Sequence, residues 1–113
     1  MYILYGISNC NTVKKAKDWL ELNNIEYQFH DYRKQGLTTD LLKTFEAKLG
    51  WKTLLNKQST SWRKLTDDQK KAISKESALQ YMLETPTLIK RPILDTGEKM
   101  IIGFKADNYQ QQL

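Results

Sequence analysis

The sequence predicts an α/β fold, because a strand pattern, a helix pattern and a second strand pattern follow one another in its first third. Residues 2–5, Tyr-Ile-Leu-Tyr, are a short β-prone run that ends at Gly6. From Asn11 to the pair Asn23-Asn24, apolar residues recur at helical spacing. Residues 25–30 then alternate apolar and polar side chains, which is typical of a strand. A helical crossover of this length joins parallel strands, so we expect a βαβ unit.

The middle of the chain is predicted to be helical, as an insertion over about residues 38–85. Apolar residues mark one face of a helix from residue 41 to 49, which Gly50 would end. Thr66 and Gln69 form a capping-box pattern for a helix over residues 67–74. A further helix over residues 76–84 is expected to stop before Pro86.

The last third is predicted to return to strands. Residues 93–94 and 100–102 flank the turn sequence Asp-Thr-Gly-Glu, which indicates two short antiparallel strands. The tail from Phe104 to Leu113 is expected to be a short, weakly held helix. The resulting order is β-α-β, a helical insertion and β-β-α, with a mixed sheet, in a single domain over residues 1–113.

Composition restricts the setting of the protein. A chain of 113 residues can bury a sufficient core as one domain, and its single cysteine excludes an internal disulfide. The N-terminus lacks the apolar stretch of a signal peptide, and no run approaches the roughly 20 apolar residues of a membrane span. We therefore expect a reduced, cytoplasmic location without a membrane.

The formal net charge of +5 favours anionic partners. The basic residues are spread through the sequence rather than gathered in one block, so a solvated basic surface is expected and nucleic acid is not. The oligomeric state expected by default is a monomer.

The only cysteine, Cys10, follows "GISN" and directly precedes the first predicted helix. Two readings compete for it: a buried apolar filler, or a nucleophile. Free N–H groups at a helix N-terminus favour an anion and lower the pKa of a thiol from its reference value of about 8.5. Core thiols usually lie within strands or helix faces, whereas this one lies between polar residues, so the position favours the nucleophile.

Val13 stands where a C-x-x-C motif would have its second cysteine. A resolving thiol must therefore come from outside the motif. This indicates a monothiol cycle, in which Cys10 attacks a disulfide or another electrophile and a small thiol, glutathione above all, releases it by exchange.

Arg91 directly precedes Pro92 at the entrance to the third predicted strand. X-Pro bonds adopt the cis form at low cost, and a guanidinium is a permanently charged, bidentate donor for a carboxylate or oxyanion. The alternative is an ordinary loop before a strand, and the pattern alone leaves both readings open.

Four sequence segments follow one another along the chain: "SNCNTVKKA", "GWKTLLNK", "SWRKL" and "ETPTLIKRPIL". With these segments in this order, the sequence resembles the arsenate reductase (ArsC) and Spx family, and most of all its YffB branch. The resemblance covers nearly the whole chain. The resemblance implies a thioredoxin-like fold with a helical insertion, Cys10 as the reactive thiol, Arg91 as the anion-binding arginine and Pro92 as a cis proline. It places Thr12 where the family helps to hold the anion.

The chain departs from the glutaredoxin-coupled arsenate reductases at three positions. Those enzymes carry arginines where this sequence has Asn56 and Gly103, and a histidine where it has Gly6. Because a charge-assisted hydrogen bond contributes roughly 1.5–3 kcal/mol, the loss of two arginines disfavours efficient arsenate reduction.

The other candidate residues have supporting roles. Asn11 and Thr12 are predicted to steady the thiolate, and the resemblance implies that Asn56, Lys57 and Arg63 could contact glutathione. We expect His30 to be a surface or strand-end residue and no metal or bound cofactor. The tryptophans, Trp19, Trp51 and Trp62, are expected to be core and packing anchors.

The sequence thus favours a small thiol oxidoreductase that resembles arsenate reductase and uses glutathione as co-substrate, with glutaredoxin as a possible partner. The alternative of a different class is an Spx-like regulator that docks on RNA polymerase or another large partner, although Val13 removes the C-x-x-C redox switch. A second alternative is a true arsenate reductase.

Overall fold

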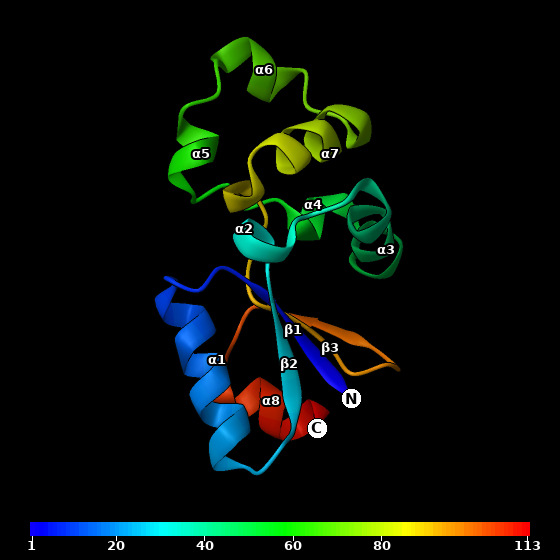
Figure 1. Cartoon of the computed structure of the whole chain (residues 1–113). Helices are drawn as coiled ribbons and strands as arrows, with labels where there is room; N and C mark the ends of the chain where they lie inside the picture. The colour runs from blue at the N-terminus through cyan, green and yellow to red at the C-terminus, as the bar shows by residue number, and fades with distance from the viewer. The chain divides into compact units, whose positions relative to one another are not determined.

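The computed structural model describes residues 1–113, which form two compact units. The sheet unit contains residues 1–36 and 91–113, and the helical unit contains residues 37–90. Figure 1 shows the sheet in the first unit and a series of helices in the second. The predicted helical insertion spans about residues 38–85 and therefore lies inside the helical unit. That the two units make a single domain stays a prediction.

The sheet unit contains a four-stranded mixed sheet in the order β2-β1-β3-β4. Its strands are β1 (Tyr2–Gly6), β2 (Tyr27–Asp31), β3 (Ile93–Asp95) and β4 (Met100–Ile102). β1 and β2 are parallel and joined through α1 (Asn11–Leu22), whereas β3 is antiparallel to both β1 and β4. The predicted α/β class, the βαβ unit and the antiparallel pair are confirmed.

The connection from α1 to β2 shortens the second strand relative to the prediction. Asn24 has a left-handed φ of 58°, and the N–H of Ile25 donates to the Leu20 carbonyl at 2.9 Å. Residue 25 therefore still belongs to the turn that ends α1, and β2 begins only at Tyr27.

The C-terminal helix α8 (Ala106–Gln112) is anchored in the core of the sheet unit. Tyr109 is fully buried and packs edge-on against Trp19 of α1, with ring centroids 5.4 Å apart, and against Phe104, at 4.8 Å. Burial of an aromatic side chain contributes about 1.5–3 kcal/mol. The expectation that the tail is weakly held is therefore wrong at this residue.

The helical unit consists of short helices, four of which are capped by the side chain of a serine or threonine. They are α3 (Thr39–Leu49), α4 (Trp51–Leu54), α5 (Thr60–Arg63), α6 (Asp67–Lys71), α7 (Lys75–Glu84) and the 3-10 turn η1 (Pro86–Leu88). The predicted capping box of Thr66 and Gln69 is present. α6 ends before the predicted residue 74 because Ser74 caps α7. The longest helix of the chain, α1, has 12 residues, and no helix has the length and hydropathy to cross a bilayer.

Gly6 closes β1 against α1. A Cβ atom at this position would lie 2.8 Å from Cγ2 of Val13, a fully buried, β-branched residue of α1. We expect Gly6→Ala to lower the free energy of unfolding by about 1–3 kcal/mol, because overpacking forces side chains and backbone to shift. Denaturant unfolding measures the change. The control is a double-mutant cycle with Val13→Ala, which removes the clashing methyl groups. The loss in the double variant should be smaller than the sum of the losses in the two single variants.

Candidate active site

Cys10 is the N-cap residue of α1, at the end of the loop that leaves β1. Its backbone is extended, with φ of −104° and ψ of 125°, and its carbonyl accepts the first helical hydrogen bond, from the N–H of Lys14 at 3.0 Å. Its own N–H donates to the Ile7 carbonyl at 3.3 Å, which closes the loop as a turn. The side chain is half-buried at the edge of the core. The thiol is thus neither sealed among aliphatic groups nor fully solvated.

The surroundings of the thiol lower its pKa below the usual value. Burial alone raises the pKa of Cys10, but the N–H groups of Val13 and Thr12, and the Arg91 guanidinium through its charge and a hydrogen bond, lower it by more. The thiol makes no formed side-chain cap hydrogen bond, so the two amides act on it as nearby dipoles. This is the physical basis of thiolate stabilisation at a helix N-terminus.

Arg91 and Pro92 lie where the chain re-enters the sheet unit, directly before β3. The Arg91–Pro92 peptide bond is cis, as the resemblance implied, and Pro92 is fully buried. The Pro92 carbonyl accepts a hydrogen bond from the N–H of Gly103 at 2.8 Å, next to the β3–β4 pair. The hydrogen bond at Pro92 thus anchors the backbone next to Arg91. The Arg91 side chain lies within hydrogen-bonding reach of the Cys10 thiol.

An aromatic cluster that the sequence analysis did not identify lies near Arg91. Tyr32 is buried, and burial first, then the neighbouring Tyr5, raise the pKa of its hydroxyl, whereas the charge of Arg91 opposes that rise. The His30 ring lies 5.0 Å from Tyr5 and 6.2 Å from Tyr32, centroid to centroid. His30 Nε2 also pairs with the Gly36 carbonyl at 2.8 Å, so His30 is a strand-end residue, as expected.

Asp31 is the one buried charged residue of the chain, with 3% of its surface exposed. It caps the short helix α2 (Tyr32–Gln35) by accepting a hydrogen bond from the N–H of Arg33 at 2.8 Å. Burial raises the pKa of Asp31, but the Arg33 amide, the hydroxyl and N–H of Ser8, and the charge of Lys34 lower it by more. Ser8 belongs to the Cys10 loop, and the register pairs Gly6 with Asp31. An aspartate between a strand and a helix was the signal that could have identified this carboxylate.

The remaining predicted site residues divide between the two units. Asn11 and Thr12 begin α1, next to Cys10. Asn56, Lys57 and Arg63 belong to the helical unit. The N–H of Asn56 donates to the Leu88 carbonyl at 2.7 Å, and its Oδ1 accepts from the N–H of Gln58 at 3.1 Å. Arg63 is exposed in the last turn of α5. The role of these three residues in glutathione binding stays a prediction.

The three tryptophans have different environments. Trp19 packs against the core of the sheet unit, as expected. Trp51 and Trp62 are only half-buried, and each has a lysine ammonium group near its ring. Trp51 and Trp62 therefore lie outside the buried core, and their role as packing anchors stays a prediction.

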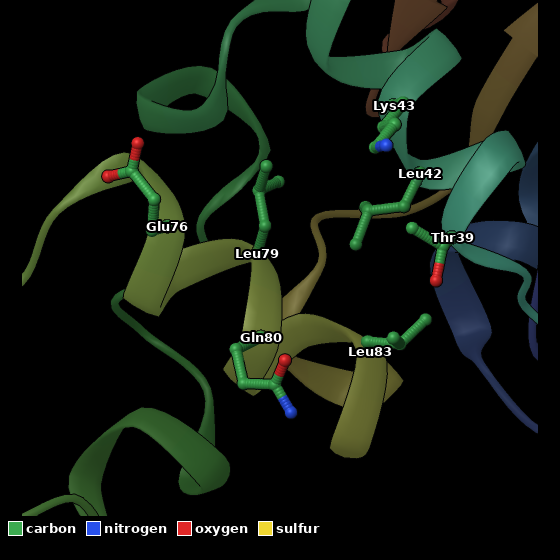
Figure 2. A pocket seen from close by; sticks show the side chains of 7 residues that line it. All are labelled: Thr39, Leu42, Lys43, Glu76, Leu79, Gln80 and Leu83. Atoms are coloured by element: carbon green, nitrogen blue, oxygen red, sulfur yellow. The ribbon is translucent and has the colours of Figure 1, made fainter.

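A separate hollow of about 250 Å³ lies in the helical unit between α3 and α7. Figure 2 shows the side chains of Leu42, Leu79 and Leu83 directed into it, with Glu76 and Lys43 farther out. It contains no thiol and no imidazole, so it is not a candidate for thiol chemistry. The structure also contains no group of three or more His, Cys, Asp or Glu side chains placed to hold a metal ion.

The ArsC family profile matches residues 5–112 of the chain. The protein belongs to the ArsC family. The solved structure of the YffB protein is 41% identical, with a TM-score of 0.91, and the match covers 98% of this chain and 97% of YffB. An arsenate reductase (ArsC) related protein from Brucella melitensis is 42% identical, with a TM-score of 0.83 and coverage of 97% and 92%. The thioredoxin-like fold class is thereby confirmed.

The chain is also similar to transcriptional regulators of the Spx type. The global transcriptional regulator Spx 1 of Lactococcus lactis is 28% identical over 109 residues, which is 95% of this chain and 84% of the regulator. The proteins similar to this chain thus include one named as related to arsenate reductase and one named as a transcriptional regulator.

Proposed function

We propose that this ArsC-family protein is a glutathione-dependent thiol oxidoreductase that acts through Cys10 alone. The observation that carries the proposal is the half-buried thiol at the N-terminus of α1, whose pKa is lowered by two backbone amides and by Arg91. The membership of the ArsC family supports thiol chemistry in general.

The reaction consists of two thiol–disulfide exchanges. The Cys10 thiolate attacks the glutathionyl sulfur of a disulfide, so that the Cys10–glutathione S–S bond forms as the original S–S bond breaks, and the departing thiolate takes a proton from water. A glutathione thiolate then attacks the Cys10–glutathione mixed disulfide, which releases oxidised glutathione and regenerates the Cys10 thiolate. No second cysteine of the chain takes part, because the chain has one.

The side chains around Cys10 have distinct roles in this scheme. Arg91 pairs with a carboxylate of the glutathionyl group and stabilises the thiolate. The N–H groups of Thr12 and Val13, together with Asn11, steady the thiolate. In the proposal, Asn56, Lys57 and Arg63 supply further contacts to glutathione. Glutaredoxin would serve as an alternative reductant of the mixed disulfide.

The test is formation and release of a mixed disulfide at Cys10. With oxidised glutathione, intact-mass spectrometry should show one glutathionyl group on the wild-type chain and none on Cys10→Ser. Reduced glutathione should then remove it. The proposal would be contradicted if the wild-type chain stayed unmodified, or if the adduct also formed on Cys10→Ser.

A second candidate is a regulatory binding protein, favoured by the similarity to Spx over 95% of the chain. In that case the chain docks on RNA polymerase, and Cys10 contributes little. Retention of binding to purified RNA polymerase by Cys10→Ser, together with the absence of an adduct on the wild type, would select this function. Arsenate reduction is the third candidate, and we expect it to be weak, because Asn56 and Gly103 replace two arginines.

A further inference from the structure

The helical unit contains a second hollow, of about 440 Å³, whose walls combine aromatic, aliphatic and cationic groups. Its lining consists of Trp51, Lys52, Leu55, Lys57 and Ile73. The volume falls in the range of small-molecule sites, roughly 300–1,000 Å³. One indole ring, two aliphatic side chains and two ammonium groups line it, and no carboxylate does.

Lys57, which lines the hollow, also lies near a second indole, that of Trp62. The Nζ of Lys57 lies 5.6 Å from the ring centroid of Trp62, and the Nζ of Lys70 lies 5.8 Å from the same ring. The Nζ of Lys52 lies 5.7 Å from the ring of Trp51. We call the hollow, Trp62 and Lys70 together the Trp–Lys surface.

The charges of this surface are not neutralised within the protein. The helical unit contains one salt bridge, between Lys75 and Glu46 at 3.3 Å. No ion pair involves Lys52, Lys57 or Lys70. Glu46 uses its other oxygen to accept the N–H of Trp51 at 3.2 Å. Cation–π contacts at such distances contribute about 0.5–1 kcal/mol at exposed sites, which leaves the ammonium groups available to an anion.

We propose that the Trp–Lys surface binds a phosphate-bearing heteroaromatic ligand of the nucleotide class. A flat heterocycle matches the half-buried faces of Trp51 and Trp62, since stacking of a base on an aromatic side chain contributes roughly 1–3 kcal/mol. The ammonium groups supply the charge that a phosphate requires, and Leu55 and Ile73 exclude water from the ring. The net charge of +5 favours the approach of such an anion. This site does not involve the Cys10 thiol, and Lys57 is the one residue that it shares with the proposed glutathione contacts.

The three tryptophans make the proposal testable by NMR. Titration of the chain with AMP should shift the indole N–H signals of Trp51 and Trp62, with a Kd of roughly 1 mM or tighter. The signal of Trp19, which packs against Tyr109 in the sheet unit, should stay in place. Adenosine and ribose 5-phosphate each lack one half of the ligand, so each should bind about tenfold more weakly than AMP.

Variants separate the site from general electrostatics and from the thiol. Lys57→Ala should weaken AMP binding about tenfold, a loss of about 1.4 kcal/mol, whereas Lys15→Ala, at an exposed position of α1, should not. Cys10→Ser should bind AMP as the wild type does, so a failure of the thiol proposal leaves this one standing.

Three results would overturn the assignment. They are unmoved signals of Trp51 and Trp62 at saturating AMP, equal binding of ribose 5-phosphate and AMP, and equal losses in Lys57→Ala and Lys15→Ala. A short single-stranded oligonucleotide that bound far more tightly than AMP would replace the nucleotide by nucleic acid as the ligand.

Discussion

Replacing Arg91 by glutamine should slow the alkylation of Cys10 at pH 7 by roughly tenfold, the change typical for loss of a charge partner within hydrogen-bonding reach. Arg91 lowers the pKa of Cys10 both through its charge and through a hydrogen bond, whereas burial of the thiol raises it. Without the guanidinium, burial is opposed only by the two amides of α1. The fraction of thiolate at neutral pH therefore falls. Iodoacetamide kinetics between pH 5 and 10 measure both the rate and the pKa.

Arg33→Gln is the matched control, because Arg33 has an exposed side chain in the same unit and the substitution changes the net charge equally. Its alkylation profile should overlay that of the wild type. Arg91→Lys should recover part of the rate, since an ammonium group restores the charge without the bidentate fork. A profile of Arg91→Gln that matches the wild type at every pH would show that the amides alone hold the thiolate.

Helices and strands were predicted correctly where the pattern of apolar residues extended over more than one helical turn. The period of three to four residues after Asn11 and the alternation before Asp31 both predicted their elements correctly. The four-residue helices α4 and α5 were missed, because so short a segment does not display an amphipathic period. The firm anchoring of α8 was missed for another reason: the partners of Tyr109 lie far away in the sequence.

The sequence predicted those parts of the site whose chemistry only one type of side chain can supply. A lone cysteine before a helix, and an arginine before a proline, indicated the two groups that the structure brings together. The aromatic cluster of Tyr5, His30 and Tyr32 could not be predicted in the same way, because it depends on the parallel register of β1 and β2. That register also places Asp31 beside the start of the Cys10 loop.

Asp31→Ala should lower the free energy of unfolding at pH 7 by about 2 kcal/mol, since hydrogen bonds to a charged group contribute about 1.5–3 kcal/mol and loss of an N-cap costs about 0.5–2 kcal/mol. The carboxylate is buried and holds the start of α2 through the Arg33 amide. Urea unfolding at pH 7 measures the loss. Asp18→Ala, the same substitution at an exposed position of α1, should change the free energy by no more than about 0.5 kcal/mol.

The acid dependence provides an independent readout of the same carboxylate. Because the pKa of Asp31 is lowered in the folded chain, its contribution is fully present above the unfolded pKa of about 3.9 and is lost as the pH falls through the folded pKa. Asp31→Asn keeps a capping side chain but not the charge, so it should be less stable than the wild type at pH 7 and approach it in strong acid. If the difference between wild type and Asp31→Asn stayed constant across that range, the charge of Asp31 would contribute nothing and the cap alone would hold α2.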